Sequence, residues 1–427
     1  MKRWNRPFGY CKELGCKDGI KRKAGEKRVS WVDRFLGRSQ VRIHRRLLKN
    51  ESEYYDFSLL AVIIALTGFG LIMLYSATAY SARVSEGNDM TYFSKQGAIS
   101  VACLIISIVV SQLDYHLLAK VAAPLYLASL VLMGLVHTPL GIDSHGAKRW
   151  IGYGPVNFQP SEVAKIAVIV ILSSCIVRMG RRIERLGGIA FLLGLGAVQA
   201  VFCWLVTNNL STGIIIMSIT AGMVFLAHPR TKVFVIAAAV ISGLVGVFIL
   251  VISRAPILSS NFRLRRIMVW LQPEKYADGY GYQTMQGLYA IGAGGIMGRG
   301  LGNSIQKLSS IPEAQNDMIF AIICEELGIV GAVFLLGMFA YMLYRLLFIA
   351  QNAPDYFGSL LVGGVFLHIA LQVILNVAVV VNLIPNTGVT LPFISYGGTS
   401  ILFLMFEMGI ALSVSKQITL RHDRPAL

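Results

Sequence analysis

Charged residues are scarce in this sequence. Only 14% of its 427 residues are Asp, Glu, Lys or Arg, and 55% are hydrophobic. Because a typical soluble domain carries roughly 25% charged residues, this composition excludes an ordinary soluble protein. The chain also lacks strands of about 10 residues with alternating apolar and polar positions, which are typical of membrane β-barrels.

Long apolar runs occupy most of the chain instead. A helix needs about 20 apolar residues to cross a bilayer, and we find ten runs near that length, although the second, fourth and sixth are short. We therefore predict an all-α polytopic membrane protein with ten transmembrane helices. The runs are at 57–78, 96–112, 117–137, 161–177, 188–206, 212–226, 232–252, 318–344, 356–380 and 398–415.

Motifs for metals and nucleotides are missing as well. No glycine-rich nucleotide loop and no HExxH pattern occurs, so we expect no organic cofactor and no nucleic-acid partner. Cys11 and Cys16 lie in a basic tail without further metal ligands beside them. The other four cysteines lie in apolar runs, where we expect them to fill the core; they are Cys103, Cys175, Cys203 and Cys324.

Positive charge is concentrated in the first residues. Residues 1–50 hold 16 Lys and Arg against four Asp and Glu, and no apolar segment of a signal peptide follows them. Since cytoplasmic segments are enriched in Lys and Arg, we place a basic tail (1–56) inside, then the membrane domain (57–416) and a short cytoplasmic tail (417–427). The basic tail is either a disordered segment that fixes topology or a contact for anionic lipids or a cytosolic partner.

The large loop between the seventh and eighth spans, 254–316, departs from this charge rule, because it is basic although it lies outside. It is either a solvated loop or, as we prefer, an electropositive mouth for an anionic lipid. Its first part predicts a helix in the membrane interface, with one apolar face made of Leu264, Ile267, Met268 and Leu271. The basic residues of that helix, expected to face lipid head groups, are Arg263, Arg265 and Arg266. The glycine-rich part that follows predicts a tightly folded, re-entrant segment.

Two more polar segments interrupt the outer side. Loop 138–160 leads into Glu162 and Lys165, which share a helix face and can pair; the pair is either a site inside the membrane or a helix end that reaches into water. Residues 382–400 hold two prolines, three glycines and five Ser or Thr, which favours a structured loop that lines a cavity. We expect these segments and the basic loop to surround one groove.

Together these motifs resemble the SEDS family (shape, elongation, division and sporulation), the FtsW/RodA-type polymerases of bacterial cell-wall glycan. The likeness covers residues 57–416. It depends on LYSATAYS, GAKRWIGYGPVNFQPSEVAK, GLGNSIQKLSSIPEAQNDMIFAIICEELGIVG and IPNTGVTLPFISYGGTS, in this order. The resemblance implies an enzyme that polymerises lipid II, a disaccharide-pentapeptide on undecaprenyl pyrophosphate, at the outer face of the cytoplasmic membrane.

The resemblance also implies partners and a place in the cell. Members of the family work beside a class B penicillin-binding protein, a transpeptidase that crosslinks the peptides, and division members work with other divisome membrane proteins. The long basic tail and the IPNTGVTLPFISYGG run favour the division or sporulation branch over the elongation branch. We therefore expect this protein at the division septum.

Individual residues follow from the same resemblance. The catalytic carboxylate of the family lies in a PE-x-x-x-D-F motif, so Asp317 is expected to be catalytic, with Met318 in place of the aromatic residue. Glu162, Lys165 and Arg149 match polar residues of the family. At 207–216 many relatives carry an acidic PDxGT motif, whereas this chain has Asn209, so a role for that acid does not carry over.

We assign two further groups around Asp317. The expected substrate-binding residues are Arg149, Glu162, Lys165, Arg263, Arg265, Arg266, Pro312, Glu313, Gln315 and Ser395. The expected supporting residues are Glu325, Glu326, Pro392, Gly397 and Gly398. Glu325 and Glu326 diverge by about 100° on a helix, so we expect one of them to bond to a neighbouring helix.

The predicted chemistry is an inverting glycosyl transfer. Asp317 would take the proton of an acceptor hydroxyl as general base. The cationic residues would meet the charge on the leaving pyrophosphate, with a divalent cation such as Mg²⁺ or Mn²⁺ as a further candidate that leaves little trace in a sequence.

Other interpretations stay open at the level of sequence. Asp317 is also a suitable N-cap for the eighth span. Ionisable groups inside ten spans equally suit a flippase for lipid-linked sugars or an ion-coupled transporter, and a third alternative is a non-catalytic scaffold for division partners.

Overall fold

The structure is a computed structural model that describes residues 53–144, 147–153, 156–229, 231–254, 262–308, 311 and 314–419. The predicted basic tail, with Cys11 and Cys16, therefore lies outside the described residues. So do Pro312 and Glu313.

Nine helices in the described part of the chain are long and apolar enough to cross a membrane. The runs that seemed short in the sequence correspond to helices of 22, 20 and 18 residues (α3, α5 and α7). The nine helices are α2 (Phe57–Glu86), α3 (Thr91–Gln112), α4 (His116–Gly134), α5 (Pro160–Met179), α6 (Leu186–Leu205), α7 (Leu210–Ala227), α11 (Ile319–Asn352), α12 (Tyr356–Val380) and α13 (Gly398–Lys416).

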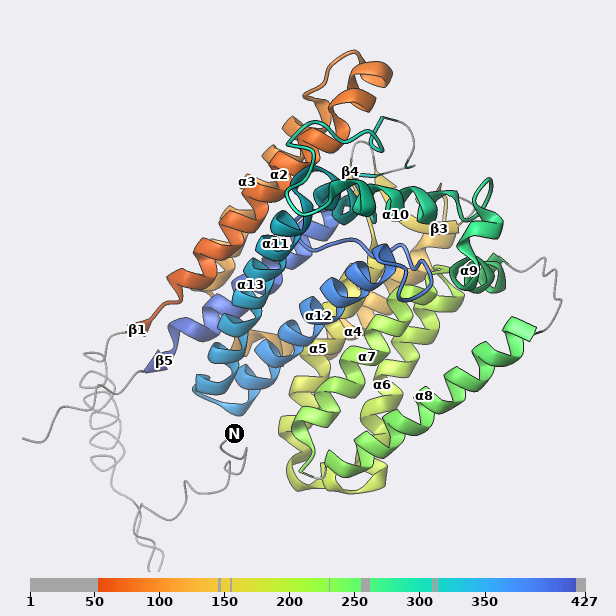
Figure 1. Cartoon of the computed structure of the whole chain (residues 1–427). Helices are drawn as coiled ribbons and strands as arrows, with labels where there is room; N and C mark the ends of the chain where they lie inside the picture. The colour runs from red at the N-terminus through yellow and green to blue at the C-terminus, as the bar shows by residue number, and fades with distance from the viewer. Residues whose placement is uncertain are drawn as a thin grey trace, which may run out of the picture.

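The two ends of the membrane domain lie side by side. Strand β1 (Glu53–Tyr54) pairs antiparallel with β5 (Ile418–Thr419) (Figure 1). A chain that enters and leaves on the same side crosses an even number of times. This parity supports α8 (Thr231–Arg254) as the remaining crossing in addition to the nine. It agrees with the prediction of ten spans and two termini on one side.

Ionic contacts join the helix ends on the side of β1 and β5. Arg345 Nη2 lies 2.7 Å from Asp56 Oδ2. His116 lies between two carboxylates, with Nδ1 2.6 Å from Asp114 Oδ1 and Nε2 2.6 Å from Asp355 Oδ2. Hydrogen bonds, foremost that from the backbone N–H of His116, hold the pKa of Asp114 below its ordinary value. By the charge rule this is the cytoplasmic side.

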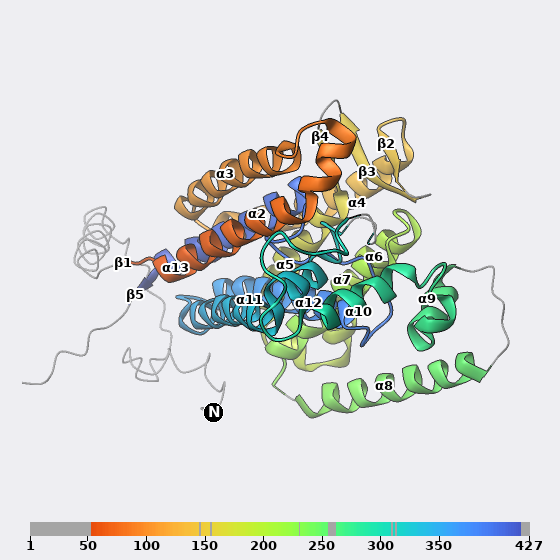
Figure 2. The same cartoon turned by 45° about the horizontal axis from the view of Figure 1, so that its top comes forward.

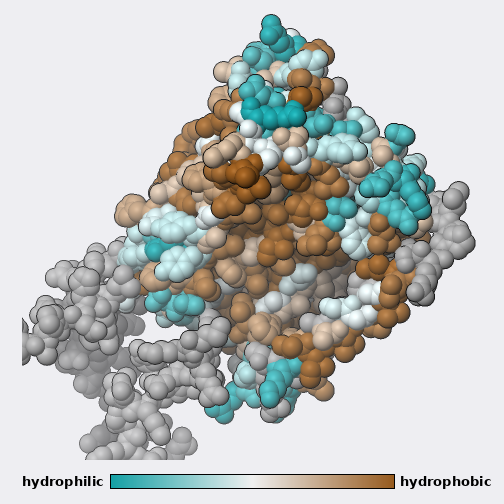
Figure 3. Space-filling view, viewed as in Figure 1, coloured by the Kyte–Doolittle hydropathy of each residue, from teal (hydrophilic) through white to brown (hydrophobic). Residues whose placement is uncertain are grey.

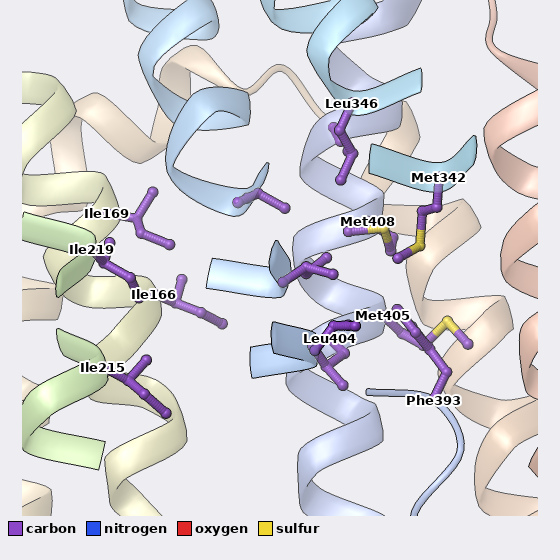
Figure 4. Close-up of a cluster of buried hydrophobic side chains, with 14 of the residues drawn as sticks. Ile166, Ile169, Ile215, Ile219, Met342, Leu346, Phe393, Leu404, Met405 and Met408 are labelled. Carbon is purple, nitrogen blue, oxygen red and sulfur yellow. The ribbon is translucent and has the colours of Figure 1, made fainter. Parts of the chain in front are cut away.

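The core surrounds α12, which packs against α5, α7, α11 and α13. Buried side chains lie there in two groups, with Ile169 and Ile219 on one side and Met342 and Met408 on the other (Figure 4). A helix that is apolar all round is suited to such a central place. At the edges, α2 and α3 lie on one side of the bundle and α8 on the other (Figure 2). The face with α11 and α12 is mostly hydrophobic, with hydrophilic residues gathered toward its ends (Figure 3), as expected of a surface in contact with lipid.

Smaller elements cover the opposite, outer side. A three-stranded antiparallel sheet, β2 (Gly141–Ser144), β3 (Ala147–Tyr153) and β4 (Val156–Phe158), precedes α5. The predicted interfacial helix is present as α9 (Phe262–Leu271), and α10 (Tyr282–Gly294) follows it. Short 3₁₀ turns occur at η2 (Leu135–His137), η3 (Gly180–Glu184) and η4 (Pro273–Tyr276).

Helix α11 is broken at Gly328, which has φ 66° and ψ −165°. A break leaves backbone groups without their helical partners, and the segment after α10 supplies replacements. The carbonyl groups of Glu325 and Glu326 accept hydrogen bonds from the N–H groups of residues 299 and 300. In return, the N–H groups of residues 329 and 330 donate to the carbonyl groups of residues 295 and 296. The glycine-rich segment thus packs into the helix break, in agreement with the prediction of tight folding.

Candidate functional site

Asp317 lies at the outer end of α11, in the turn just before the helix. Its side chain is half-buried. The N-cap of α11 is Met318, which makes no side-chain capping bond, so the alternative of Asp317 as N-cap is wrong. Met318 itself is 1% exposed and packs into the core, where the resemblance expected an aromatic residue.

The turn that carries Asp317 is held by three donors from a distant part of the chain. The carbonyl oxygens of residues 315–317 each accept one hydrogen bond. The donors are Tyr396 N (2.9 Å), Ser395 Oγ (2.6 Å) and Asn376 Nδ2 (2.9 Å). All three bonds are accepted by backbone carbonyl groups. They therefore fix the turn independently of the conformations of the side chains at residues 315 and 316.

Two of these donors have further bonds that support the same arrangement. Asn376 lies on α12, is fully buried, and also donates to the carbonyl oxygen of Val389 at 2.8 Å. Ser395 Oγ accepts a hydrogen bond from Leu391 N at 2.8 Å. The structure therefore places Ser395, predicted to bind substrate, as a support of the turn beside Asp317.

Gln283 on α10 contacts the carboxylate directly. Its Nε2 donates to Asp317 Oδ1 at 3.2 Å, and its Oε1 accepts from Asn386 Nδ2 at 3.5 Å. Sequence reasoning missed Gln283, Asn386 and Asn376. The one available signal for Asn376 was its amide, one turn after that of Gln372, in an otherwise apolar run.

The turn at Asn386 and Thr387 is where several outer elements meet. The carbonyl oxygen of Asn386 accepts a hydrogen bond from Arg266 Nη1 of α9 at 3.1 Å. The carbonyl oxygen of Thr387 accepts one from Ser211 Oγ of α7 at 2.8 Å. Together with Gln283, these bonds join α7, α9 and α10 to the loop before α13, so the outer polar segments meet at this turn. That they surround one groove stays a prediction.

The outer sheet is joined to the same region through Arg149. Its Nη2 donates to the carbonyl oxygen of Asn208 at 3.1 Å. Asn208 has φ 51°, and Asn209 after it caps α7 through its side chain, which accepts from Thr212 N. In this chain the position of the acidic motif is thus occupied by an asparagine that serves as a helix cap.

Glu162 and Lys165 form the pair expected from their spacing. Lys165 Nζ lies 2.9 Å from Glu162 Oε1, and their side chains are 3% and 9% exposed, respectively. A pair that reaches into water from a helix end would be exposed, so that alternative is wrong. Glu162 Oε2 is buried without a hydrogen-bond partner among the residues that the structure describes.

The arginines of α9 lie at the outer surface. Arg266 is exposed, and the Arg265 guanidinium lies 4.0 Å from the centre of the Tyr280 ring, a cation–π contact. The side chain of Arg263 lies outside what the structure describes. Through its bond to the carbonyl oxygen of Asn386, Arg266 lies on the same side of the bundle as Asp317.

Glu325 and Glu326 are both fully buried and hold the segment that leads to Asp317. Glu326 bonds to Ser76 of α2 at 2.7 Å, which is the predicted contact with a neighbouring helix, and to Lys307 at 2.7 Å. Glu325 accepts from Ser304 Oγ at 2.5 Å and from the N–H of Ile305 at 3.1 Å.

The remaining supporting residues lie around the start of α13. Pro392 precedes Phe393, whose φ is 63° and whose carbonyl oxygen lies against Gly70 of α2. Gly397 N donates to Gln96 Oε1 at 3.4 Å, and Gly398 begins α13 against Ile99.

No group of three or more His, Cys, Asp or Glu among the described residues is arranged to hold a metal ion. Near Asp317 the described part of the chain offers one carboxylate but no complete set of metal ligands.

Taken together, these features define a polytopic helical membrane protein with a fixed carboxylate at the outer ends of its helices, linked through Gln283 and Asn386 to the exposed Arg266. A family model described as cell cycle protein FtsW/RodA/SpoVE matches residues 57–420. The chain belongs to this family, the SEDS family of the sequence motifs.

Individual relatives are similar over most of their length. A probable peptidoglycan glycosyltransferase FtsW of Trichlorobacter lovleyi is 37% identical over 86% of this chain and 94% of its own. Stage V sporulation protein E of Bacillus subtilis is 36% identical, over 84% of this chain and 97% of its own.

Solved structures agree with the fold. A chain from a study of the structural coordination of polymerization and crosslinking by a peptidoglycan synthase complex matches with a TM-score of 0.69 and 27% identity, over 84% of this chain and 97% of its own. The rod shape determining protein RodA of Thermus thermophilus matches with a TM-score of 0.62 and 25% identity, over 86% of this chain and 98% of its own.

Proposed function

We propose that this protein is a peptidoglycan glycosyltransferase that polymerises lipid II into glycan strands at the outer face of the cytoplasmic membrane. The observation that carries the proposal is Asp317: a half-buried carboxylate at the outer end of α11, on a turn whose carbonyl groups are held at three successive positions. The name of the relative from Trichlorobacter lovleyi, probable peptidoglycan glycosyltransferase FtsW, supports the same reaction.

In the proposed reaction Asp317 acts as general base. It takes the proton from the acceptor sugar hydroxyl, whose oxygen forms a bond to the anomeric carbon of the donor. The bond from that carbon to the pyrophosphate oxygen breaks, and undecaprenyl pyrophosphate leaves with the electron pair. An α-linked donor gives a β-linked product in this single displacement, so no glycosyl-enzyme intermediate forms.

Cationic residues are proposed to meet the charge on the pyrophosphate. Arg266 and Arg265 lie on α9 at the outer surface, while Lys165 and Arg149 lie near the start of α5. A divalent cation, Mg²⁺ or Mn²⁺, is part of the proposal, held by substrate phosphates together with protein oxygen atoms. It would supply further charge stabilisation of the leaving group.

We propose that an apolar groove on α11 and α12 holds part of the lipid of this substrate. It is lined by apolar side chains alone and includes Leu383, three residues before Asn386. A polyprenyl chain in the groove would lie in the membrane while its head group reached the turn at Asn386. The lining residues are Leu336, Val373, Ile374, Val377, Ala378, Val381 and Leu383.

We also propose a partner and a place of action. The partner is a class B penicillin-binding protein with transpeptidase activity, because a solved relative is part of a peptidoglycan synthase complex. Likeness to both FtsW and stage V sporulation protein E favours septal wall synthesis, in division or sporulation, together with other divisome membrane proteins.

The test is polymerisation of purified lipid II by the protein with its partner and Mg²⁺ or Mn²⁺, followed on gels. Asp317→Asn, which keeps the size of the side chain but removes the base, should lower the rate by about 10²–10⁴-fold. The matched control is Asp278→Asn, at an exposed position of the outer loop, which should polymerise at the wild-type rate.

Three results would contradict the proposal in different ways. Equal polymer from wild type and Asp317→Asn refutes the assignment of the base. No polymer from wild type, with movement of fluorescent lipid II across vesicle membranes, would instead establish a flippase. Neither activity, with retained binding of division partners, would establish a scaffold.

A further inference from the structure

Gln283 makes a hydrogen bond to the proposed base, although it lies 34 residues earlier in the chain. Its Nε2 is 3.2 Å from Asp317 Oδ1. An ionised carboxylate only accepts hydrogen bonds, so the amide of Gln283 must turn its NH₂ group toward Asp317. The contact therefore favours the charged form of the carboxylate, the form that can take a proton, because a hydrogen bond to an ionised oxygen is stronger.

The oxygen of the Gln283 amide is held by a second hydrogen bond, which favours the same orientation of the amide group. Its Oε1 accepts from Asn386 Nδ2 at 3.5 Å, and Asn386 Oδ1 accepts from Gly388 N at 2.9 Å. Because Asn386 presents a donor to Gln283, the carbonyl side of the Gln283 amide faces Asn386. Both neighbours thus select the same orientation of the amide.

The helix that carries Gln283 is docked closely against α11. A Cβ at Gly287 would lie 3.7 Å from Met318 Sδ, beside Asp317 in sequence, and a Cβ at Gly294 would lie 1.9 Å from the carbonyl oxygen of Cys324. Residues 283, 287 and 294 share one face of α10, since they are separated by four and seven positions. At Gly294 the backbones approach so closely that no side chain would fit, whereas Gly287 lies in ordinary contact range of Met318. The close approach at Gly294 therefore holds α10, and with it Gln283, against α11.

We propose that Gln283 is a positioning residue for the base: it orients the Asp317 carboxylate and keeps it ionised, with Asn386 as its support. This inference rests on the proposed function. Hydrogen bonds to the charged form of a group favour that form, so the bond extends the activity of the enzyme to lower pH. At the same time it holds Oδ1, which fixes the plane of the carboxylate for the acceptor hydroxyl.

The test compares the pH dependence of lipid II polymerisation for wild type, Gln283→Leu and Gln283→Glu, each with the transpeptidase partner. Gln283→Leu removes the donor, and we expect the acid limb of kcat/KM to move to higher pH by about one unit. At neutral pH kcat should fall about tenfold, with KM changed less than twofold. Gln283→Glu is nearly isosteric but adds a second carboxylate, so its acid limb should move further up than that of Gln283→Leu.

Two controls separate positioning from mere support of the fold. Gln272→Leu makes the same change at an exposed residue of the outer loop and should leave the profile unchanged. Thermal unfolding in detergent reports whether each variant folds, and Gln283→Glu retains a polar side chain of equal length should Gln283→Leu be unstable. A structural role alone would lower the rate equally at every pH.

The inference is overturned if the acid limbs of wild type and both Gln283 variants coincide while Asp317→Asn is inactive. In that case Asp317 keeps its role and only the role of Gln283 is refuted. If Asp317→Asn polymerises normally, the base itself is refuted and the positioning role with it. The two failures are therefore distinguishable in one set of measurements.

Discussion

At the scale of single residues, two adjacent carboxylates show how buried charge is used in this protein. Glu325 and Glu326 are both fully buried, yet they leave the helix in different directions. Glu326 meets Ser76 and Lys307, and Glu325 meets the turn at 304–306. A buried ion without its partner is costly, so these carboxylates hold the segment before Asp317 in one position.

Lys307→Met should destabilise the protein strongly. The Lys307 ammonium donates to Glu326 Oε1, Ser76 Oγ and the carbonyl oxygen of Gly302, at 2.7, 3.1 and 2.7 Å. Its loss leaves the Glu326 charge buried and unneutralised, which should lower the free energy of unfolding by about 3–5 kcal/mol. Thermal unfolding in detergent measures the effect.

A matched variant separates this cause from loss of a surface charge. Lys275→Met, at an exposed lysine of the outer loop, should unfold at the wild-type temperature. The double change Lys307→Met with Glu326→Gln removes both charges and should recover part of the lost stability. An unfolding temperature of Lys307→Met equal to that of Lys275→Met would contradict the account.

At the scale of elements, the break in α11 is the feature that builds the outer half of the site. Gly328 has a φ of 66°, a region that glycine adopts readily and other residues rarely. A Cβ there would lie 2.4 Å from both Gly298 N and the carbonyl oxygen of Ile296. The backbone of the segment after α10 therefore fits into the break only because position 328 carries no side chain.

Gly328→Ala should displace the segment after α10 from the helix break. The rate of lipid II polymerisation should then fall at least tenfold, and the unfolding temperature should fall as well. The matched control lies on the same helix: Gly337 has regular helical surroundings, and a Cβ there would meet nothing within 4 Å. Gly337→Ala should leave activity unchanged and raise stability by up to about 1 kcal/mol, since alanine favours helix. Similar activities for the two variants would show that the break is not needed.

Elements also show where sequence reasoning succeeded and failed. The bounds of most spans were predictable, because length and hydropathy are local properties, and α9 was predictable from the spacing of its apolar residues. The buried pair of His368 and Glu407, 2.8 Å apart between α12 and α13, was not predicted. Each residue appeared alone in its apolar run, and nothing local indicates that two helices bring them together.

At the scale of the whole molecule, topology follows from how the ends pair. Strands β1 and β5 put both ends of the described membrane domain on one side, so nine spans in its described part favour α8 as a tenth crossing. Placement of the arginines of α9 on the outer side depends on that crossing. The bonds of the turn at Asn386 and Thr387 with α7, α9 and α10 agree with it.

Cysteine labelling tests this topology. In a background with Cys11 and Cys16 replaced by serine, Asp278→Cys should react with an impermeant maleimide on intact spheroplasts. Pro229→Cys, exposed at the other end of α8, should react only after the membrane is opened. Labelling of both positions from outside would show that α8 does not cross.

The sequence by itself determined the class of protein and the places of the apolar spans, because these depend on composition and on hydropathy over short segments. Its motifs, through their family resemblance, also indicated Asp317 as the aspartate that we propose as the base. Only the tertiary structure decided what surrounds that aspartate. Gln283 and Asn376, which bond to its carboxylate and to its backbone carbonyl, lie 34 and 59 residues away along the chain. Amides are common in loops and rare in spans, but their partners depend on how remote helices pack, and no local pattern carries that information.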